Sequence, residues 1–324
     1  MKDAVELLRG RSLVVTGGTG FLGSAVVRAA VEAGAEVVVL GRRTSDRWRL
    51  ESVEGGYRFV DAPLESLRDR SLALPSGALL VHAAAAGVNQ REGPPDLLAA
   101  VNVNGTRAVA EWALRHECER LVVLGTSGEY GAGVGHREDA APCPTSEYGV
   151  TRAKATRVAR DFGVANGLDV VVVRPFAVYG PFEAAYRLIP HVIVSALRGQ
   201  PPRISTGEQT RDYVHVSDVV SGIARACTAE AAHGGVFNLC TGVETSVREA
   251  ATLAAELVDP AIHVLAGAVP GIPGEMGRTS GDPAAARRVL GWEPRLDLRH
   301  GLTETVQWFR SSGHDQPAYE GSVG

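Results

Sequence analysis

The sequence predicts an α/β protein in which a doubly wound parallel sheet is joined to a smaller α/β lobe toward the C-terminus. Three observations predict this fold class. Short apolar segments alternate with helical ones through the first half of the chain. A glycine-rich turn stands between the first strand-like segment and the first helical one. After about Pro181 the rhythm changes, because prolines interrupt the segments.

The predicted strands of the first half are short, and several are β-branched and apolar throughout, as strands buried on two faces should be. They are Leu13–Thr16, Glu36–Leu40, Arg58–Val60, Leu79–His82, Leu121–Gly125 and Val170–Arg174. The helical patterns between them are Phe21–Ala33, Pro95–His116 and Tyr148–Ala165. Right-handed crossovers between such strands give a Rossmann-type sheet, whose ligands bind at the carboxyl ends of the strands.

The first strand-like segment runs directly into three glycines at a spacing of three. Strand, tight turn and helix N-terminus together predict a site for a dinucleotide pyrophosphate, since glycine lets the backbone approach the phosphates and the helix end offers N–H groups. The residues expected to contact the cofactor here are Gly17, Thr19, Gly20, Phe21, Leu22 and Gly23.

The division of the chain follows from the change of rhythm. Residues 1–180 are expected to form the NAD(P)-binding domain, and residues 181–311 a smaller substrate-binding lobe, with part of the chain crossing back to the first domain. Residues 312–324 show no periodicity and are expected to form a flexible tail. Helices are predicted at Val216–Thr228, Val247–Val258 and Pro283–Leu290, while Pro190, Pro201, Pro202, Pro270 and Pro273 are expected to break the segments.

Two arginines follow the second predicted strand and bear on the choice of cofactor. An acidic residue there would bind a ribose 2′-hydroxyl, whereas arginine suits a 2′-phosphate. Arg42 and Arg43 therefore favour NADP(H), with NAD(H) still possible and solvated surface arginines as the alternative. Asp61, next to Ala62 after the third strand, is placed either to accept from the adenine amino group or to form a turn.

The fourth strand ends in small side chains. Ala83 and Ala84 would let the backbone lie against a flat ligand, or would serve helix packing. His82, alone on its strand, is interpreted as a structural hydrogen-bonding residue.

Composition excludes several classes of protein. Hydrophobic residues make up 45% of the 324 residues and charged residues 22%, as is usual for globular proteins. The net charge of −4 gives no reason to expect a nucleic acid or an anionic membrane as partner, and no apolar run is long enough to span a bilayer. The four cysteines lack the spacings of a metal site, so we expect reduced thiols in a cytoplasmic protein.

A tyrosine and an arginine one turn apart suggest proton-transfer chemistry. Tyr148 and Arg152 stand at i and i+4 of a predicted helix and share a face, so the positive charge is expected to lower the pKa of the phenol. Thr126 follows a strand, which puts its hydroxyl at the carboxyl edge of the sheet. Such a tyrosine can act as general acid or base toward a carbinol oxygen, with a nearby hydroxyl holding the substrate.

With these segments in order, the chain resembles the extended short-chain dehydrogenase/reductase family, and within it the nucleotide-sugar epimerases, dehydratases and 4-ketoreductases. The segments that carry the resemblance are Thr16–Gly23, His82–Ala85, Asn102–Thr106, Arg174–Pro181, Gln209–Asp218 and the run from Arg278 to Pro294. The resemblance makes Tyr148 the catalytic acid/base, Thr126 its hydroxyl partner and Arg152 the cation beside them.

The resemblance also implies binding residues. Asn102 and Pro175 would lie beside the cofactor, and Ser127 beside the substrate. Arg211 and Arg278 are similar to the family's diphosphate-binding arginines, with salt bridges as the alternative. Family members often form homodimers through two helices, so a homodimer is expected by analogy.

The chain departs from the family pattern at several positions. Arg152 stands where the family has lysine, and arginine holds its proton too tightly to pass it on. Ser127 and Gly128 replace the Asp-Glu pair of the 4,6-dehydratases, and Glu129 stands where an apolar residue is usual, so dehydration is disfavoured. Ala177 replaces a frequent asparagine beside the substrate phosphates.

Three functions remain open on this reading. Because reduction consumes hydride and NADPH is the cellular donor, Arg42 and Arg43 favour a reductase of a dTDP-4-keto-6-deoxyhexose. The first alternative is an NAD-dependent 4-epimerase of a UDP- or dTDP-hexose. The second is a non-catalytic NADP-binding protein, which Arg152 and Glu129 motivate.

Overall fold

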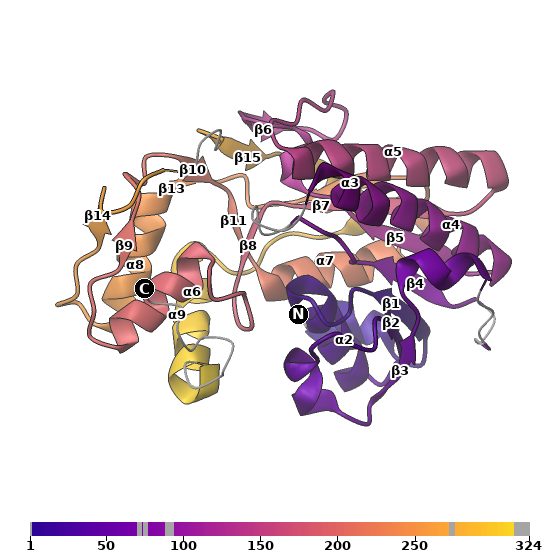
Figure 1. The fold of residues 1–324 in the computed structure, drawn as a ribbon, viewed down its shortest axis with the longest axis horizontal. Helices are drawn as coiled ribbons and strands as arrows, with labels where there is room; N and C mark the ends of the chain where they lie inside the picture. Colours follow the sequence, from indigo (N-terminus) through magenta and orange to yellow (C-terminus); the bar gives the residue numbers. More distant parts are fainter. Residues whose placement is uncertain (1, 70–72, 74–76, 88–93, 272–275, 314–324) are drawn as a thin grey trace.

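The centre of the molecule is a seven-stranded parallel sheet in the order β12-β7-β5-β4-β1-β2-β3 (Figure 1). A computed structural model of the chain describes residues 2–69, 73, 77–87, 94–271 and 276–313. The strands of this sheet are β1 (Ser12–Thr16), β2 (Glu36–Gly41), β3 (Tyr57–Asp61), β4 (Leu79–His82), β5 (Arg120–Leu124), β7 (Val170–Pro175) and β12 (Val236–Leu239). The predicted fold class is confirmed, and each of the six predicted strands is present within a residue or two of its expected bounds.

Helices cover both faces of the sheet because the strands are apolar on both (Figure 1). Leu13, Val15 and their neighbours on one face pack against α2 (Phe21–Glu32) and α7 (Val216–Thr228). Val14, Val38 and their neighbours on the other face pack against α4 (Gly105–Arg115) and α5 (Glu147–Asn166). Burial on two faces is what makes each strand a continuous apolar run in the sequence.

The long helical pattern after β4 is present but not uniform. It begins as α3 (Pro95–Leu98), continues as the π-helical segment η4 (Ala99–Asn104) and ends as α4. A π-helical turn inside a longer helix is rare and is often found at functional sites.

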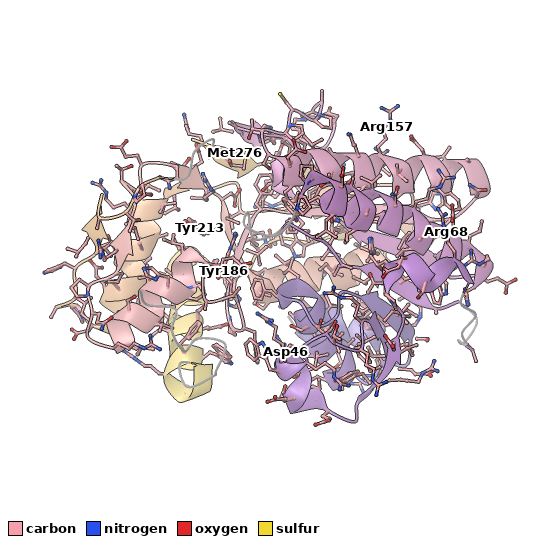
Figure 2. All side chains as sticks on the ribbon, in the orientation of Figure 1. Asp46, Arg68, Arg157, Tyr186, Tyr213 and Met276 are labelled. Carbon is pink, nitrogen blue, oxygen red and sulfur yellow. The ribbon has the colours of Figure 1, made fainter. Side chains whose placement is uncertain are left out.

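The small lobe has its own apolar core. Its helices are α6 (Leu188–Leu197), α8 (Val247–Val258) and α9 (Leu298–Trp308), which bury Val192, Ala251, Val306 and their neighbours. The short strands β9 (Arg203–Ile204) and β14 (Leu265–Ala266) pair beside them, as do β10 (Thr210–Arg211) and β13 (Thr245–Ser246). Tyr186 and Tyr213 lie where this lobe meets the large domain (Figure 2).

The expectation that Pro190 breaks a segment is wrong, because Pro190 is the third residue of α6. The N–H groups of a first helical turn have no partner within the helix, so proline is tolerated there. Ser312 and Gly313 belong to the π-helical turn η8 (Phe309–Gly313), and the rest of the expected flexible tail lies outside the described residues.

Part of the later chain returns to the large domain. Helix α7 and strand β12 both pack there, together with the π-helical segment η7 (Ala286–Leu290). Two further strand pairs join the parts, β8 (Ala177–Tyr179) with β11 (Tyr213–His215) and β6 (Gly133–His136) with β15 (Thr279–Gly281). The remaining helical elements are α1 (Lys2–Val5), η1 (Glu6–Leu8), η2 (Trp48–Val53), η3 (Leu64–Asp69), η5 (Ser127–Glu129) and η6 (Glu230–Ala232).

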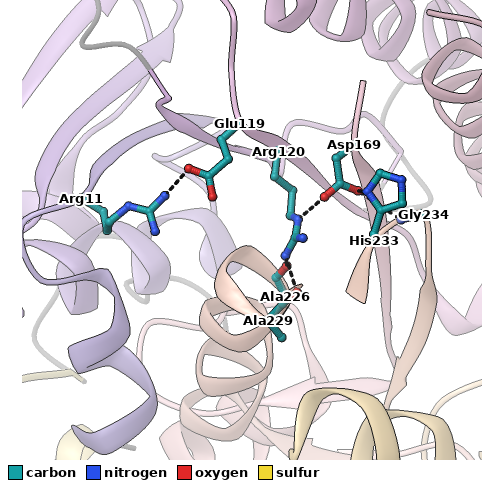
Figure 3. Close-up of polar contacts among 8 residues, drawn as sticks. All are labelled: Arg11, Glu119, Arg120, Asp169, Ala226, Ala229, His233 and Gly234. Carbon is teal, nitrogen blue, oxygen red and sulfur yellow. Dashed lines mark hydrogen bonds and ion pairs between the residues drawn. The ribbon is translucent and has the colours of Figure 1, made fainter. Parts of the chain in front are cut away.

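A buried ion pair lies at the amino edge of the sheet, opposite the edge that holds the expected site (Figure 3). Arg120 opens β5 and its Nε donates to Asp169 Oδ2 over 2.6 Å. Arg120 Nη1 also donates to the carbonyl oxygens of Ala226 and Ala229 at the end of α7. The guanidinium thereby joins sheet and helix, and a cation at a helix C-terminus is favourable.

Removing Asp169 is therefore expected to destabilise the fold. Asp169→Ala leaves the Arg120 charge buried without its carboxylate, which should lower the free energy of unfolding by about 3–5 kcal/mol. Glu119→Ala is the matched control, because Glu119 pairs with Arg11 in an exposed ion pair worth about 1 kcal/mol or less. Urea unfolding of the two variants checks the difference, and equal losses would contradict it.

Among the described residues, no helix combines the length and the apolar character that crossing a membrane requires.

Candidate active site

The expected cofactor loops lie against one another at the carboxyl edge of the sheet. The Ala83 N–H donates to the Thr16 carbonyl oxygen over 3.0 Å. A Cβ atom at Gly17 would come within 2.4 Å of the Ala84 backbone nitrogen. Since β1 and β4 are neighbours whose crossovers run in opposite directions, this is the point of a doubly wound sheet where ligands bind.

Glycine is required in the turn for two reasons. Gly17 has φ +68°, a left-handed conformation that side chains disfavour, and a Cβ atom at Gly23 would lie 2.2 Å from the Gly17 carbonyl oxygen. Helix α2 begins at once, with Gly20 as its N-cap and no side-chain hydrogen bond capping it. Thr19, Phe21 and Leu22 are half-buried and Gly20 is exposed. The predicted strand, turn and helix are confirmed, and the phosphate site that they favour stays a prediction.

Side chains of both charges lie at the carboxyl ends of β2 and β3, where the adenine end of a dinucleotide is expected. Arg42 and Arg43 follow the last residue of β2 and are exposed. Asp61 ends β3 and its Oδ1 accepts the Arg43 N–H over 2.9 Å, while Ala62 beside it is buried. Within the described ranges, no carboxylate pairs with either guanidinium, so both are open to an anionic ligand.

His82 is a buried, neutral hydrogen-bonding residue. Thr106 donates its hydroxyl proton to the Asn102 carbonyl oxygen, so it accepts from His82 Nε2–H over 2.9 Å. His82 Nδ1 then accepts from the Thr16 hydroxyl over 2.6 Å. Burial lowers the pKa of His82 to about 3, with the Arg152 charge acting in the same direction. The structure thus supports the structural interpretation of this histidine.

Asn102 sits in the π-helical segment and holds two parts of the site together. Its Nδ2 donates to the Ala86 carbonyl oxygen and to the Thr151 hydroxyl, and its Oδ1 accepts the Ala86 N–H. The Asn102 amide thus fixes the loop after β4 against α5, and both of its N–H groups are used by protein atoms.

Thr126 N-caps the short turn η5 after β5 and is half-buried beside Ser127. Glu129 completes a capping box, in which its Oε1 accepts the Thr126 N–H over 3.1 Å and the Thr126 hydroxyl accepts the Gly128 N–H over 3.2 Å. Glu129, which is unusual at this position, therefore has a structural role in capping this turn, and the sequence pattern did not predict that role.

Helix α5 carries the expected catalytic pair. Ser146 caps it by accepting the Gly149 N–H, and Tyr148 lies half-buried in its first turn. A Cβ atom at Gly149 would lie 2.5 Å from the Gly128 carbonyl oxygen, so the Thr126 turn and the start of α5 are in direct contact. The structure brings Thr126, Tyr148 and Arg152 to one region.

Arg152 is the most unusual residue of the site. It is 2% exposed, and its buried Nε and Nη1 atoms have no hydrogen-bond partner among the residues that the structure describes. An unsatisfied buried N–H group is costly, at about 1–3 kcal/mol each, so a native guanidinium in this state calls for a ligand. The hydroxyl groups of a nicotinamide ribose are acceptors of the right kind, and the residues present fit a dinucleotide cofactor.

The Arg152 charge lowers the pKa of Tyr148 as expected, but the net shift of that pKa is upward. Burial raises the pKa of Tyr148 above its usual value, and the Glu129 charge adds to this rise. The Arg152 and Arg187 charges lower the pKa, as expected, but they do not outweigh desolvation.

The two expected diphosphate arginines lie close together, because Thr210 beside Arg211 hydrogen-bonds Gly277 beside Arg278. Arg211 is in β10, and its Nη1 donates to the carbonyl oxygens of Thr210 and Met276, each over 2.8 Å. Arg278 precedes β15, and its Nε donates to Glu244 Oε1 over 3.1 Å. The predicted salt-bridge alternative therefore holds for Arg278, whose side chain is nevertheless 65% exposed.

Glu183 and Arg187 were missed by sequence reasoning. They form an i,i+4 ion pair of 3.4 Å in the segment that leads from β8 into α6, and burial raises the pKa of Glu183 to about 7. The charge of Arg187 reaches Tyr148. The available signal was the acidic–basic spacing itself, directly after the segment Arg174–Pro181.

Comparison with known proteins identifies the chain's relatives. Residues 13–240 match the model of the NAD dependent epimerase/dehydratase family. A UDP-glucose 4-epimerase from Mycolicibacterium smegmatis is 33% identical over 92% of this chain and 98% of its own length. A dTDP-glucose 4,6-dehydratase from Streptomyces niveus is 31% identical over 93% of both chains.

Two solved structures are similar throughout. A dTDP-glucose 4,6-dehydratase from Streptomyces venezuelae, solved with NAD and TYD bound, has a TM-score of 0.84 at 28% identity, covering 95% of this chain and 99% of its own. A UDP-glucose 4-epimerase from Thermotoga maritima, solved with UDP-glucose, has a TM-score of 0.82 at 29% identity, covering 92% and 98%. The chain therefore belongs to the NAD-dependent epimerase/dehydratase family, the nucleotide-sugar branch of the extended short-chain dehydrogenases/reductases.

Proposed function

We propose that this chain is an NADPH-dependent 4-ketoreductase that reduces a dTDP-4-keto-6-deoxyhexose. The observation that carries the proposal is the pair Arg42 and Arg43 at the end of β2, exposed and without a carboxylate partner within the described residues. Guanidinium groups suit the 2′-phosphate that distinguishes NADPH from NADH. NADPH is consumed by reductases, whereas an epimerase regenerates its cofactor.

The chain's own residues would bind the cofactor and handle the proton. The residues proposed to contact the cofactor are Gly17, Thr19, Gly20, Phe21, Leu22, Gly23, Arg42, Arg43, Asp61, Ala62, Ala83, Ala84, Asn102, Tyr148, Arg152 and Pro175. The bound nicotinamide supplies the hydride. Tyr148 gives its phenolic proton to the sugar oxygen, the Thr126 hydroxyl holds that oxygen, and Arg152 meets the ribose through its two unsatisfied nitrogen atoms.

The raised pKa of Tyr148 favours the reductive direction. The ordinary pKa of a phenol is about 10, and burial and the Glu129 charge raise that of Tyr148 further, so the phenol is protonated at neutral pH. A protonated phenol is a proton donor, as reduction of a ketone requires, whereas alcohol oxidation requires a base.

The residues around Thr126 argue against a dehydratase. The substrate is proposed to be bound mainly through its diphosphate. Ser127 and Gly128 carry no carboxyl group, and both Glu129 oxygens are occupied by Thr126, Thr156 and Arg174. Ser127, Arg211 and Arg278 are the proposed substrate contacts, with the two arginines meeting the diphosphate.

A 4-epimerase is the second candidate. Similarity to 4-epimerases from two organisms at 29–33% identity favours it, as does the NAD in the related dehydratase structure. The two candidates differ in their use of cofactor, since an epimerase keeps NAD bound and a reductase consumes NADPH.

Mass spectrometry of the ligand released from purified protein, followed by an NADPH oxidation assay with a dTDP-4-keto-6-deoxyhexose, tests the proposal. Released NADP(H) and substrate-dependent oxidation of NADPH support the reductase. Tightly bound NAD with interconversion of two nucleotide hexoses identifies the epimerase. Cofactor binding without turnover of any nucleotide sugar identifies a non-catalytic protein.

The arginine pair gives a direct prediction about cofactor choice. In the variant Arg42→Ala/Arg43→Ala, the Kd for NADPH should rise about 10- to 100-fold, as expected for the net loss of one charge-assisted phosphate contact of about 1.5–3 kcal/mol. The Kd for NADH should stay the same. Arg157→Ala is the control, because Arg157 is 84% exposed on the outer side of α5 (Figure 2). Equal losses for both cofactors would contradict the NADPH preference.

A further inference from the structure

Glu129 is a fully buried carboxylate directly behind the proposed catalytic threonine. It is 0% exposed, and its two oxygen atoms accept from three different elements. Oε1 accepts the Thr126 N–H over 3.1 Å and the Thr156 hydroxyl over 3.0 Å. Oε2 accepts from Arg174 Nε over 3.0 Å and pairs with Arg174 Nη2 over 2.9 Å. A buried carboxylate satisfied in this way is held in one geometry.

These contacts tie the reacting groups together. Thr126 is in the turn after β5, Arg174 is in β7, and Thr156 is in α5. Tyr148, Arg152 and Thr156 stand four residues apart on successive turns of that helix, so the carboxylate holds the Tyr148 helix and the Thr126 turn at once.

Close packing prevents the turn and the helix from shifting independently. A Cβ atom at Gly125 would lie 2.5 Å from Glu129 Oε1, and one at Gly149 would lie 2.5 Å from the Gly128 carbonyl oxygen. Both glycines are therefore needed for the carboxylate and the helix to come this close to the turn.

We propose that Glu129 is a positioning residue, which sets the Thr126 hydroxyl against Tyr148 by clamping the turn, α5 and β7 through one buried carboxylate. The proposal rests on the proposed function only for the identity of the reacting pair. Glu129 touches neither substrate nor cofactor in this role, since its oxygen atoms are all used by protein donors.

The clamp has an electrostatic consequence. The Glu129 charge raises the pKa of Tyr148, and the charges of Arg152 on the same helix and Arg187 at the start of α6 lower it. Arg174 pairs with Glu129 from β7 and is buried with it. Removing the negative charge at position 129 leaves the Arg152 and Arg187 charges acting on the phenol and is expected to lower its pKa.

The first test weakens the clamp without breaking the ion pair. Thr156→Val keeps the shape of the side chain and removes its hydrogen bond to Glu129, so kcat should fall roughly 10-fold with the KM of the sugar nucleotide unchanged. Thr156→Ser should restore kcat. Thr305→Val is the matched control, because the buried Thr305 hydroxyl donates within α9, to the Gly301 carbonyl oxygen.

The second test does not require turnover. In protein labelled with ¹³C at the tyrosine Cζ atoms, the Tyr148 resonance, assigned by its loss in Tyr148→Phe, is titrated in wild type and in Glu129→Gln. The midpoint should move to lower pH in Glu129→Gln. Because Arg174 loses its charged partner in Glu129→Gln, circular dichroism is used to check that this variant is folded. Thr156→Val keeps the Glu129–Arg174 ion pair.

The outcomes separate this proposal from the proposed function. If the Tyr148 titration midpoint is lower in Glu129→Gln but the wild-type protein turns over no nucleotide sugar, the positioning role is supported and the reductase is rejected. A Thr156→Val kcat equal to that of Thr305→Val would overturn the positioning role, as would an unchanged midpoint in folded Glu129→Gln.

Discussion

Tyr148→Phe is expected to abolish turnover, with a loss of about 10²- to 10⁴-fold in kcat, the range that a positioned general acid contributes. The phenolic oxygen is the group that would give its proton to the sugar, and Phe lacks it. Steady-state oxidation of NADPH with the keto-sugar nucleotide measures the loss. Because the ring remains, cofactor affinity measured by fluorescence titration should change little.

The pH dependence identifies the group. The folded pKa of Tyr148 is raised, so the donor form is present through neutral pH and is lost as pH rises through that pKa. Reductive turnover should therefore be flat around neutrality and fall on the alkaline side. Tyr57→Phe is the control, since Tyr57 lies on β3 at the far edge of the sheet. An active Tyr148→Phe protein would rule out the assignment.

The sheet could be predicted because burial on both faces gives each strand its own apolar pattern in the sequence. Val14 and Val38 face one helical layer and Val15 and Val39 the other, so every strand is apolar at consecutive positions. The glycine turn could be predicted for the same reason. The left-handed φ of Gly17 and the close approach of Gly23 to the Gly17 carbonyl oxygen lie within one seven-residue segment, although Ala84 also restricts Gly17. Patterns of this kind can be recognised in a single sequence without any knowledge of tertiary contacts.

What could not be predicted depends on contacts between distant segments. Strand β12 has only four residues, and it is a strand because Val236 and Phe237 pair with Val172 and Val173 of β7. The role of Glu129 could not be predicted from the sequence, because its partner Arg174 is 45 residues away along the chain. The net rise of the Tyr148 pKa could not be predicted either, because the sequence shows the nearby Arg152 charge but not the burial of the phenol.

Replacing Arg152 should separate stability from activity. In Arg152→Met, two buried nitrogen atoms without partners are removed and an apolar chain takes their place. The cofactor-free protein should gain about 2–6 kcal/mol in the free energy of unfolding, since each of the two unsatisfied groups costs about 1–3 kcal/mol. The same change should weaken cofactor binding at least 10-fold and lower kcat. Urea unfolding with and without cofactor measures both effects.

Arg174→Met is the matched control because Arg174 is an equally buried arginine whose charge is paired. It is 4% exposed, and its substitution leaves the Glu129 carboxylate without a cation, so stability should fall by about 3–5 kcal/mol. The two Arg→Met variants are therefore expected to move stability in opposite directions. A loss of stability in Arg152→Met would show that Arg152 has a structural partner and would remove the main support for its contact with cofactor.

Arg152→Lys decides whether the positive charge alone is sufficient at this position. Lysine keeps the charge that acts on Tyr148 and adds an ammonium group that can pass a proton, which arginine cannot do. Turnover should therefore be kept or raised in Arg152→Lys while it is lost in Arg152→Met. If Arg152→Lys is as inactive as Arg152→Met, the planar guanidinium itself is required, and its two unsatisfied nitrogen atoms must be met together by the ligand.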